Sequence, residues 1–331
     1  MSRVLVPPPR DPLEPLAEAP TFSIVIPAYQ AAETIGDSIS SALAQVHPPH
    51  EIIVVDDGST DDLEAALASF GDRLTVIHKQ NGGAASARNT GASAATGEYL
   101  ALLDADDTYH PRRLESLADL ARTRPDLDLV TTDSRFVVGG RAVGSFNAEN
   151  PFPVENQRAA ILQSCFVGGW PATRLARLRE IGGFDETLRI SHDWDCALRL
   201  ILDGSQAGLV DEPYYDYRLH PGSLTASRVA SLWDRVRLLE KAEKNPALVP
   251  DERPVLTRSL RLHRSRAVVA ETEAALSDSL PRRRLARLAV SSGVGLRARM
   301  LAALAAVSPP LARSLAPHHR PPEDRFTSPR P

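Results

Sequence analysis

The sequence holds only two cysteines in 331 residues, Cys165 and Cys196, and their separation is unlike that of a metal-binding pair. We expect both to be small core residues in a reducing compartment. A run of about 18 or more uninterrupted apolar residues is missing, so we expect no transmembrane helix. The apolar core of a signal peptide is missing too. These absences favour a cytoplasmic protein.

A strong excess of one charge is also missing, because the formal net charge is −4. Nothing in that balance indicates a nucleic acid as a partner. The charges are nevertheless unevenly spread. From Pro281 onward ten arginines face two acidic residues, which gives this part a charge of +8 and leaves −12 for the rest. Proline crowds residues 1–19, which we expect to be a disordered or extended leader, and we expect the end after about Pro317 to be disordered.

Short apolar stretches alternate with segments of helical periodicity through the first 130 residues. We expect strands at 22–26, 51–55, 74–77, 99–103 and 127–131, and helices at 33–45, from 60 or 61 onward and at 84–95. Because the strands are almost wholly apolar and the connections short, the pattern predicts a mostly parallel α/β sheet covered by helices on both faces. Polar residues that follow the strands should then meet at the carboxyl edge of the sheet. From Leu232 onward the pattern is helical and interrupted by prolines.

An acidic group stands directly after the expected strand at 99–103 and consists of Asp104, Asp106 and Asp107. Alternation puts Asp104 and Asp106 on the same side of an extended segment. Gathered carboxylates repel one another, and a divalent cation is the usual compensating charge for such oxygen ligands. The alternative is a solvated acidic loop that caps a helix at Pro111. Taken alone, these residues leave both interpretations open.

Two further segments follow other expected strands and should lie at the same carboxyl edge of the sheet. Asp57 can accept a hydrogen bond from a nucleobase N–H, as uracil would offer, although ordinary strand–turn–helix punctuation also explains the Asp-Gly pair. Residues 81–89 open a helix with glycines, so backbone N–H groups can face an anion, but they match neither a Walker loop nor the dinucleotide fingerprint. Arg88 in this helix can reach a site carboxylate or a phosphate, or form a surface salt bridge.

The second half contributes other candidates. Asp193 precedes an apolar-periodic run and is a candidate general base, with a helix N-cap as the alternative. Arg218 and His220 alternate in an extended segment, a spacing that suits a diphosphate. Trp170 and Trp194 are typical of core or pocket walls, although an aromatic face can stack on a sugar.

Seven segments, taken together and in order, resemble glycosyltransferase family 2, whose members are inverting enzymes of the GT-A fold. The resemblance extends over residues 21–223, about two thirds of the chain. The segments that carry it are Ser23–Tyr29, Val55–Asp61, Asn81–Asn89, Gly97–Asp107, Gly182–Glu186, His192–Asp195 and Tyr217–His220. The resemblance implies an α/β fold of GT-A type, with a mostly parallel, Rossmann-like sheet flanked by helices and a C-terminal helical extension. It further implies transfer of a sugar from a nucleotide-diphosphate sugar, by default a UDP-sugar, to an acceptor hydroxyl in polysaccharide, cell-envelope or glycolipid synthesis.

The resemblance assigns the nucleotide-sugar pocket to Pro27, Tyr29, Asp57 and Arg88, with Asp57 on the base. Gln30 stands where the family commonly has Asn, which we expect to alter only the edge of the pocket.

The resemblance makes Asp104 and Asp106 the DXD pair, which positions the ribose and a Mn²⁺ or Mg²⁺ cofactor that bridges the diphosphate. Asp107 is the third candidate metal residue. The metal would stabilise the charge that grows on the leaving diphosphate.

Asp193 matches the family's catalytic base, and Arg218 and His220 would hold the leaving diphosphate. His192 stands where an acidic partner of the base is common, so the charge around Asp193 differs from the family pattern.

We expect the donor to be a nucleotide sugar and the acceptor to be a saccharide or a lipid-linked molecule, while the sugar, the base, the linkage and the oligomeric state stay open. Two alternatives compete. A nucleotidyltransferase usually has a glycine-rich basic signature after the first strand, which is absent at residues 27–30. A non-catalytic nucleotide-sugar-binding protein would lack a use for Asp193.

The expected domains are a disordered leader 1–20, a GT-A domain 21–230 with halves 21–132 (nucleotide sugar) and 133–230 (acceptor), a helical Arg-rich extension 231–316 and a disordered tail 317–331.

The Arg-rich region 281–313 mixes arginine with apolar residues and has two interpretations. It can lie on an anionic membrane surface, at the inner face of the cell membrane, near a lipid-linked acceptor. It can also be a helical extension that packs on the catalytic domain or on another subunit.

Overall fold

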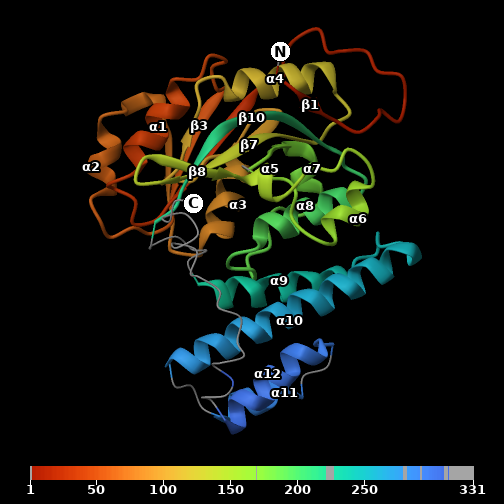
Figure 1. The fold of residues 1–331 in the computed structure, drawn as a ribbon. Coiled ribbons are helices and arrows are strands. Elements are labelled where there is room, and N and C mark those ends of the chain that lie inside the picture. The colour runs from red at the N-terminus through yellow and green to blue at the C-terminus, as the bar shows by residue number, and fades with distance from the viewer. Residues whose placement is uncertain are drawn as a thin grey trace. The chain divides into compact units, whose positions relative to one another are not determined.

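The structure is a computed structural model that describes residues 2–168, 170–220, 227–278, 282–290, 293–308 and 312. The chain divides into two compact units, Met1–His220 and Pro221–Pro331. The expected disordered tail at 317–331 lies outside the described residues, as does Gly169. Figure 1 shows the α/β character of the first unit and the helices of the second.

The first unit alternates strands and helices, as the sequence pattern predicts. Its elements are β1 Val4–Leu5, β2 Phe22–Ala28, α1 Ile35–Leu43, β3 Glu51–Asp56, α2 Leu63–Ala68, β4 Thr75–His78, α3 Ala84–Ala94, β5 Tyr99–Leu102, β6 Thr108–Tyr109, α4 Arg113–Thr123, β7 Leu129–Val138, β8 Arg141–Ser145, α5 Phe146–Glu149, α6 Gln157–Ile161, β9 Ala172–Arg174, α7 Leu175–Glu180, α8 His192–Leu202 and β10 Ala207–Arg218.

These strands form one sheet in the order β1-β10-β7-β9-β5-β2-β3-β4. Strands β5, β2, β3 and β4 are parallel neighbours, and β7 runs parallel to β10. The short strand β9 lies antiparallel between β7 and β5 and joins the two parallel parts. Since a parallel arrangement brings strand ends of one polarity to one edge, the residues after β2, β3 and β5 lie along the same edge.

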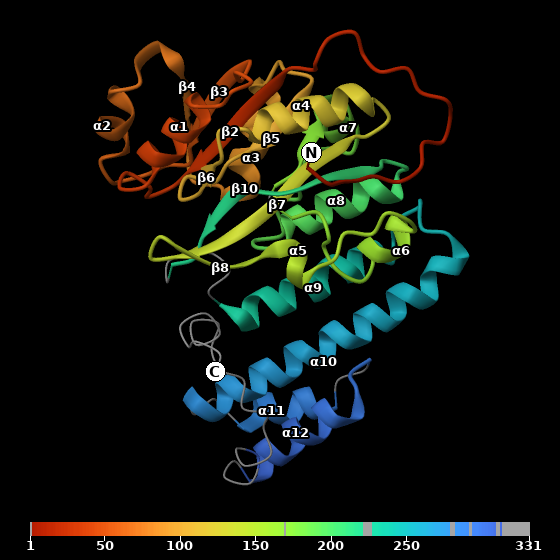
Figure 2. The same ribbon diagram turned by 45° about the horizontal axis from the view of Figure 1, so that its top comes forward.

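Helices cover both faces of the sheet (Figure 2). On one face Ile24 and Ile26 of β2 share a buried cluster with Ile35 and Ile39 of α1. Each side chain buried in this way contributes roughly 1.5–3 kcal/mol. On the other face α3 lies so close to β2 that a Cβ at Gly91 would be 2.3 Å from Val25 Cγ1. Glycine is therefore needed there, and the close approach fixes the position of α3 on the sheet.

Of the two states expected for the proline-rich leader, disordered or extended, the structure shows the extended one. Its strand β1 pairs antiparallel with β10, and the backbone N–H of Leu16 donates to the carbonyl of Arg122 at 2.9 Å. The physical reason is the free edge of β10, whose backbone groups need partners that an extended leader can supply. Proline does not prevent this, because the paired residues Val4 and Leu5 precede the prolines.

The second unit consists of the helices α9 Arg228–Ala242, α10 Arg253–Asp278, α11 Arg282–Ala289 and α12 Leu296–Val307. Helix α9 packs on α10 through a cluster that contains Leu232, Val236 and Ala267. The indole N–H of Trp233 in α9 donates to Glu271 of α10 at 2.7 Å. The expected C-terminal helical extension is thus present.

Candidate functional site

The candidate site lies at the carboxyl edge of the parallel strands. Tyr29 follows β2, Asp57 follows β3 and Asp104 comes shortly after β5. Pro27 is half-buried within β2, whereas Tyr29 is 54% exposed. Gln30 has a left-handed backbone, with φ of 52°, and its side-chain oxygen accepts from the backbone N–H groups of residues 60 and 61 at 3.0 and 3.1 Å. It therefore ties together the loops that follow β2 and β3.

Asp57 is 2% exposed, and both of its carboxylate oxygens are engaged within the protein. One oxygen accepts from Lys79 Nζ at 2.7 Å and from the N–H of Gly82 at 2.9 Å. The other accepts from the N–H of Gly83 at 2.7 Å. The carboxylate thus holds the turn that opens α3, where a negative charge is favoured by the positive end of the helix. Its predicted contact with a nucleobase would require one of these donors to give way.

Arg88 on α3 connects two distant parts of the chain. Its side chain is 2% exposed, and its guanidinium donates to Asp104 at 2.6 Å and also contacts Nε2 of His192. The guanidinium carbon lies 3.9 Å from the centre of the Trp170 ring. An arginine buried in this way needs a charged or aromatic partner on each side, and here it has both. Arg88 thereby joins the acidic group after β5 to the first residue of α8.

His192 is buried beside this guanidinium and stacks against Trp170, with ring centroids 6.1 Å apart. Burial and the positive charge of Arg88 hold the pKa of His192 well below its ordinary value. The imidazole is therefore neutral at pH 7, when Nε2 can accept a hydrogen bond from Arg88. His192 stands where an acidic partner of the base was expected to be common. It therefore contributes no negative charge next to Asp193.

The carboxyl groups that follow β5 are partly buried, and their negative charges repel one another. Burial raises the pKa of Asp104, the charge of Arg88 lowers it and the charge of Asp106 raises it, with a net upward shift. Burial, together with the charges of Asp104 and Asp106, holds the pKa of Asp107 well above the ordinary value for a carboxyl group. The group therefore carries more negative charge than its surroundings compensate.

Asp107 itself is 1% exposed and faces strand β10. Its oxygens accept from the hydroxyl of Tyr215 at 2.7 Å and from the backbone N–H of Arg218 at 2.8 Å. Because both oxygens bind protein donors, Asp107 positions β10 against the acidic group. Its role as a metal ligand stays a prediction.

Arg218 and His220 end the same strand at the site. The guanidinium of Arg218 donates to Asp37 of α1 at 2.9 Å, on the surface. His220 Nε2 lies 2.7 Å from Asp106. The structure therefore brings His220 to the DXD pair, and the carboxylate of Asp106 joins the two.

Asp193 is half-buried in the first turn of α8, next to His192. Trp194 is buried instead, and its indole N–H donates to the carbonyl of Ile161 at 2.8 Å. This places Trp194 in the core and leaves Trp170 as the aromatic wall beside Arg88. The role of Asp193 as a general base stays a prediction.

A divalent cation fits the acidic group as a partner of Asp104 and Asp106. No group of three or more His, Cys, Asp or Glu side chains is arranged to hold a metal ion among the residues that the structure describes. Mg²⁺ is commonly bound through one or two carboxylates, with substrate phosphates and water as the other ligands. The raised pKa of Asp104 shows that more positive charge would be favourable at this point.

Comparison with known proteins identifies the first unit. The sequence model described as "Glycosyl transferase family 2" matches residues 23–182. Residues 23–182 therefore carry the sequence pattern of glycosyltransferase family 2. An uncharacterized glycosyltransferase of Rickettsia typhi is 29% identical over 235 residues, which are 70% of either chain. The succinoglycan biosynthesis protein ExoO of Rhizobium meliloti is 30% identical over 65% of either chain. This chain spans 57% of a Rickettsia prowazekii glycosyltransferase and 31% of a Rickettsia felis one.

Solved structures confirm the fold of this protein. S. aureus TarS 1-349 in complex with UDP aligns with a TM-score of 0.61 and 19% identity, over 89% of this chain and 83% of that one. Mannosyltransferase PcManGT from Pyrobaculum calidifontis, in complex with GDP-Man and Mn²⁺, aligns with a TM-score of 0.57 and 22% identity, over 93% and 87%. The α/β sheet of GT-A type flanked by helices is therefore confirmed.

Several residues of the candidate site escaped the sequence analysis. Lys79 binds Asp57, Tyr215 binds Asp107 and Asp37 binds Arg218. Lys79 could have been found, because it directly follows β4 at the same edge. The other two could not, since Tyr215 and Asp37 lie more than 60 residues away from their partners in sequence.

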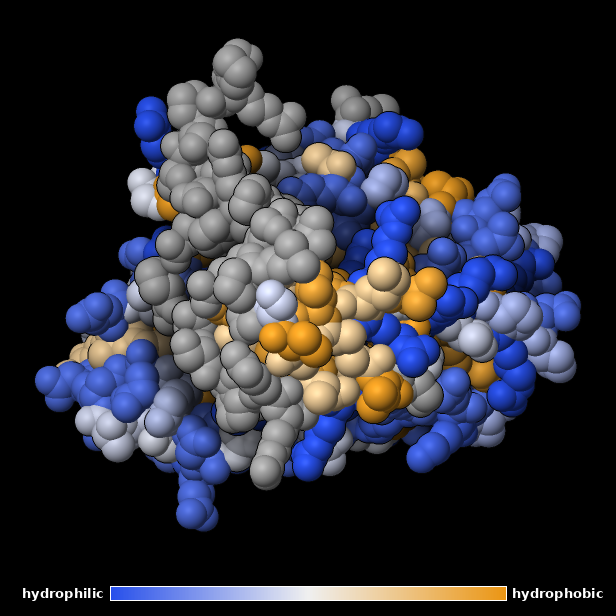
Figure 3. Space-filling model, turned by 60° about the horizontal axis from the view of Figure 1, so that its bottom comes forward, coloured by the Kyte–Doolittle hydropathy of each residue, from blue (hydrophilic) through white to orange (hydrophobic). Residues whose placement is uncertain are grey.

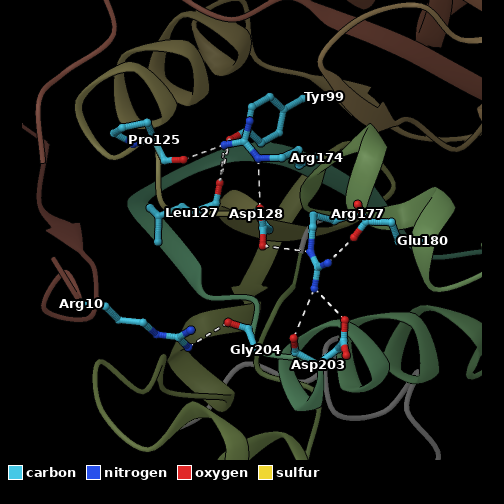
Figure 4. A network of polar contacts seen from close by, with 10 residues as sticks. All are labelled: Arg10, Tyr99, Pro125, Leu127, Asp128, Arg174, Arg177, Glu180, Asp203 and Gly204. Carbon is cyan, nitrogen blue, oxygen red and sulfur yellow. Dashed lines mark hydrogen bonds and ion pairs between the residues drawn. The ribbon is translucent and has the colours of Figure 1, made fainter. Parts of the chain in front are cut away.

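A second polar network lies at the opposite, amino edge of the strands (Figure 4). Asp128, just before β7, accepts from Arg174 at 3.0 Å, and Arg177 lies 2.7 Å from Asp203. Arg10 of the leader donates to the carbonyl of Gly204 at 2.8 Å. A cavity of about 350 Å³ lies here and is lined by Arg10, Asp11, Leu13, Asp126, Asp128, Arg177, Asp203, Gly204 and Gln206. At this edge Asp128 pairs with Arg174 and Arg177, and Asp203 pairs with Arg177.

No helix among the described residues combines the length and the apolar character needed to cross a bilayer.

Proposed function

We propose that the first unit transfers a glycosyl group from a nucleotide-diphosphate sugar to a hydroxyl of a saccharide or lipid-linked acceptor, with inversion at the anomeric carbon. The observation that carries this proposal is Arg88, which joins Asp104 to His192 and so brings the acidic group and the start of α8 together. The complexes of TarS with UDP-GlcNAc and of PcManGT with GDP-Man support a nucleotide sugar as the donor. A UDP-sugar is the default donor, and the similarity to the succinoglycan biosynthesis protein ExoO supports a role in polysaccharide synthesis.

In this proposal Asp193 takes the proton from the acceptor hydroxyl as the acceptor oxygen bonds to the anomeric carbon. The bond between that carbon and the diphosphate oxygen breaks, and its electron pair stays on the diphosphate. Because the acceptor attacks from the face opposite the leaving group, the configuration inverts. Arg218 and His220 donate to the diphosphate as its charge grows.

Pro27 and Tyr29 border the nucleoside in this arrangement, and Asp57 receives the base once a donor such as Lys79 moves. Asp104 and Asp106 would hold a Mn²⁺ or Mg²⁺ ion. When bound, that ion supplies Lewis-acid stabilisation of the diphosphate. Of the two alternatives weighed from the sequence, only the non-catalytic binder is compatible with family 2, and turnover separates it from an enzyme.

The test begins with the thermal stability of the full chain in the presence of UDP- and GDP-sugars, with and without Mn²⁺. A true donor at one hundred times its dissociation constant stabilises the fold by about 2.7 kcal/mol. Release of nucleoside diphosphate is then measured with the donor that stabilises best. We expect Asp106→Asn to remove the Mn²⁺-dependent part of the stabilisation.

The matched control is Asp203→Asn, because Asp203 is an exposed carboxylate at the opposite edge of the sheet. It should keep the Mn²⁺-dependent stabilisation. Stabilisation by a nucleotide sugar without any release of nucleoside diphosphate would favour the non-catalytic binder and overturn the proposed transfer.

A further inference from the structure

Helix α12 of the second unit has small residues inside and larger apolar residues outside. The side chains that it buries in the cluster of this unit are those of Ala298, Ala302 and Ala305. Its outer face exposes Leu296 (68%), Met300 (62%) and Val307 (80%). Large apolar side chains that gather on one exposed helix face are typical of an interaction surface. The outer face of α12 therefore calls for a partner.

The exposed residues form a continuous row. Positions 296, 300, 303 and 307 follow the spacing i, i+4, i+7 and i+11, which places them on one helix face. We call Leu296, Met300 and Val307 the apolar stripe. Figure 3, which views the side where Figure 1 draws α11 and α12, shows apolar residues gathered next to hydrophilic ones.

The charges beside the apolar stripe all have one sign. Arg297 and Arg299 are exposed on α12, and Arg287 is exposed on α11. The sequence has no acidic residue between Asp278 and Glu323. An apolar face flanked by cations on its own helix complements a surface that is apolar below and anionic above.

We propose that the apolar stripe and its arginines bind the surface of a membrane that contains anionic lipids, with α12 lying in the plane of the interface. The helix has 12 residues and is about 18 Å long, too short to span a hydrocarbon core of about 30 Å. A second copy of the chain fits less well, because a symmetric contact would bring the arginines of both copies together. Membrane binding at this surface would hold whether or not the first unit transfers a sugar.

The test is flotation of the full chain with two kinds of vesicle, phosphatidylcholine alone and phosphatidylcholine with phosphatidylglycerol. We expect binding to the anionic vesicles only, and weaker binding in high salt. Replacement of Leu296, Met300 and Val307 by serine should lower partitioning at least about tenfold, because their apolar contact is lost. Arg297→Gln with Arg299→Gln should lower it about thirtyfold, since each basic residue near an anionic surface contributes a factor of about five.

Matched controls come from α10, where Leu262 is 48% exposed and Arg258 and Arg261 are exposed. Leu262→Ser and the double variant Arg258→Gln with Arg261→Gln should float as the unchanged chain does. Circular dichroism melting of every variant shows whether the helices still fold. Equal flotation of the stripe variant and the unchanged chain would overturn the proposal.

Absence of flotation by the unchanged chain would overturn it as well. In that case sedimentation velocity would show whether the stripe variant dissociates a dimer, which would assign the surface to a second copy. Each result is independent of nucleotide-sugar turnover, so failure of this proposal and failure of the proposed transfer can be told apart.

Discussion

The two edges of the sheet are both rich in charge, yet they differ in how the charge is balanced. At the amino edge Asp128 and Asp203 each meet an arginine of the same small region. At the carboxyl edge Asp104 pairs with Arg88, but Asp107 is buried with only a hydroxyl and a backbone N–H as donors, and the pKa of both carboxyl groups is raised. Carboxyl groups whose pKa is raised by burial and by neighbouring like charges are typical of functional sites as well as of structural networks. The charges of the amino edge are thus matched by arginines, whereas the acidic group of the carboxyl edge is matched only in part.

The largest expected effect is the loss of transfer in Asp193→Asn. The amide cannot accept the proton, so we expect the rate to fall by about 10²–10⁴-fold while the dissociation constant of the donor stays unchanged. Initial rates and donor titration measure the two quantities separately. Asp203→Asn at the amino edge is the control and should keep the rate. A wild-type rate in Asp193→Asn would remove the base assignment.

Arg88→Met tests the connection between the acidic group and α8. Removing one partner of a buried ion pair leaves the other charge uncompensated, which costs about 3–5 kcal/mol of the free energy of unfolding. Urea unfolding measures the loss. Arg177→Met is the amino-edge comparison, because Arg177 is 25% exposed and its carboxylate partners stay partly solvated. We expect a smaller loss there, and equal losses would contradict the contrast between the edges.

Because His192 at the carboxyl edge is neutral in the fold, we expect the free energy of unfolding to depend on pH. Its pKa in the fold is well below the ordinary value, so below about pH 6.5 the unfolded chain binds a proton that the folded chain does not. The free energy of unfolding therefore falls as the pH is lowered from 7 to 5.

Unfolding free energies of His192→Gln over this window should show a shallower decline, because glutamine does not titrate. His50→Gln, a change at an exposed histidine, is the control and should keep the original slope. An unchanged slope in His192→Gln would mean that His192 is charged in the fold.

The smallest effect is expected at the amino edge itself. Asp128→Asn weakens the contacts with Arg174 and Arg177, which should cost about 1.5 kcal/mol of stability and leave transfer unchanged. Thermal unfolding and initial rates measure both. A large loss of transfer at unchanged stability would show that this edge also takes part in the reaction.

The sequence analysis predicted the strands of the first half because a buried parallel strand is a local pattern. Phe22–Ala28 and Glu51–Asp56 contain the expected ranges, and the strand expected at 127–131 is the longer β7. The sequence analysis missed the antiparallel strand β9, because a strand of three residues is too short to show a recognisable alternation of apolar and polar residues. The leader was expected to be disordered or extended, because its composition says nothing about the free edge of β10.

The sequence by itself determined the order of the elements, the family and the residues that follow each strand. Each of these depends on residues that are close neighbours in the sequence. The tertiary structure decided the partners. Arg88 meets His192 across 104 positions and Asp106 meets His220 across 114. Such pairs depend on how β10 and α8 pack, and no local pattern encodes that packing. The same holds for α12, whose apolar residues are evident in the sequence, while only the packed helices show which of them face outward.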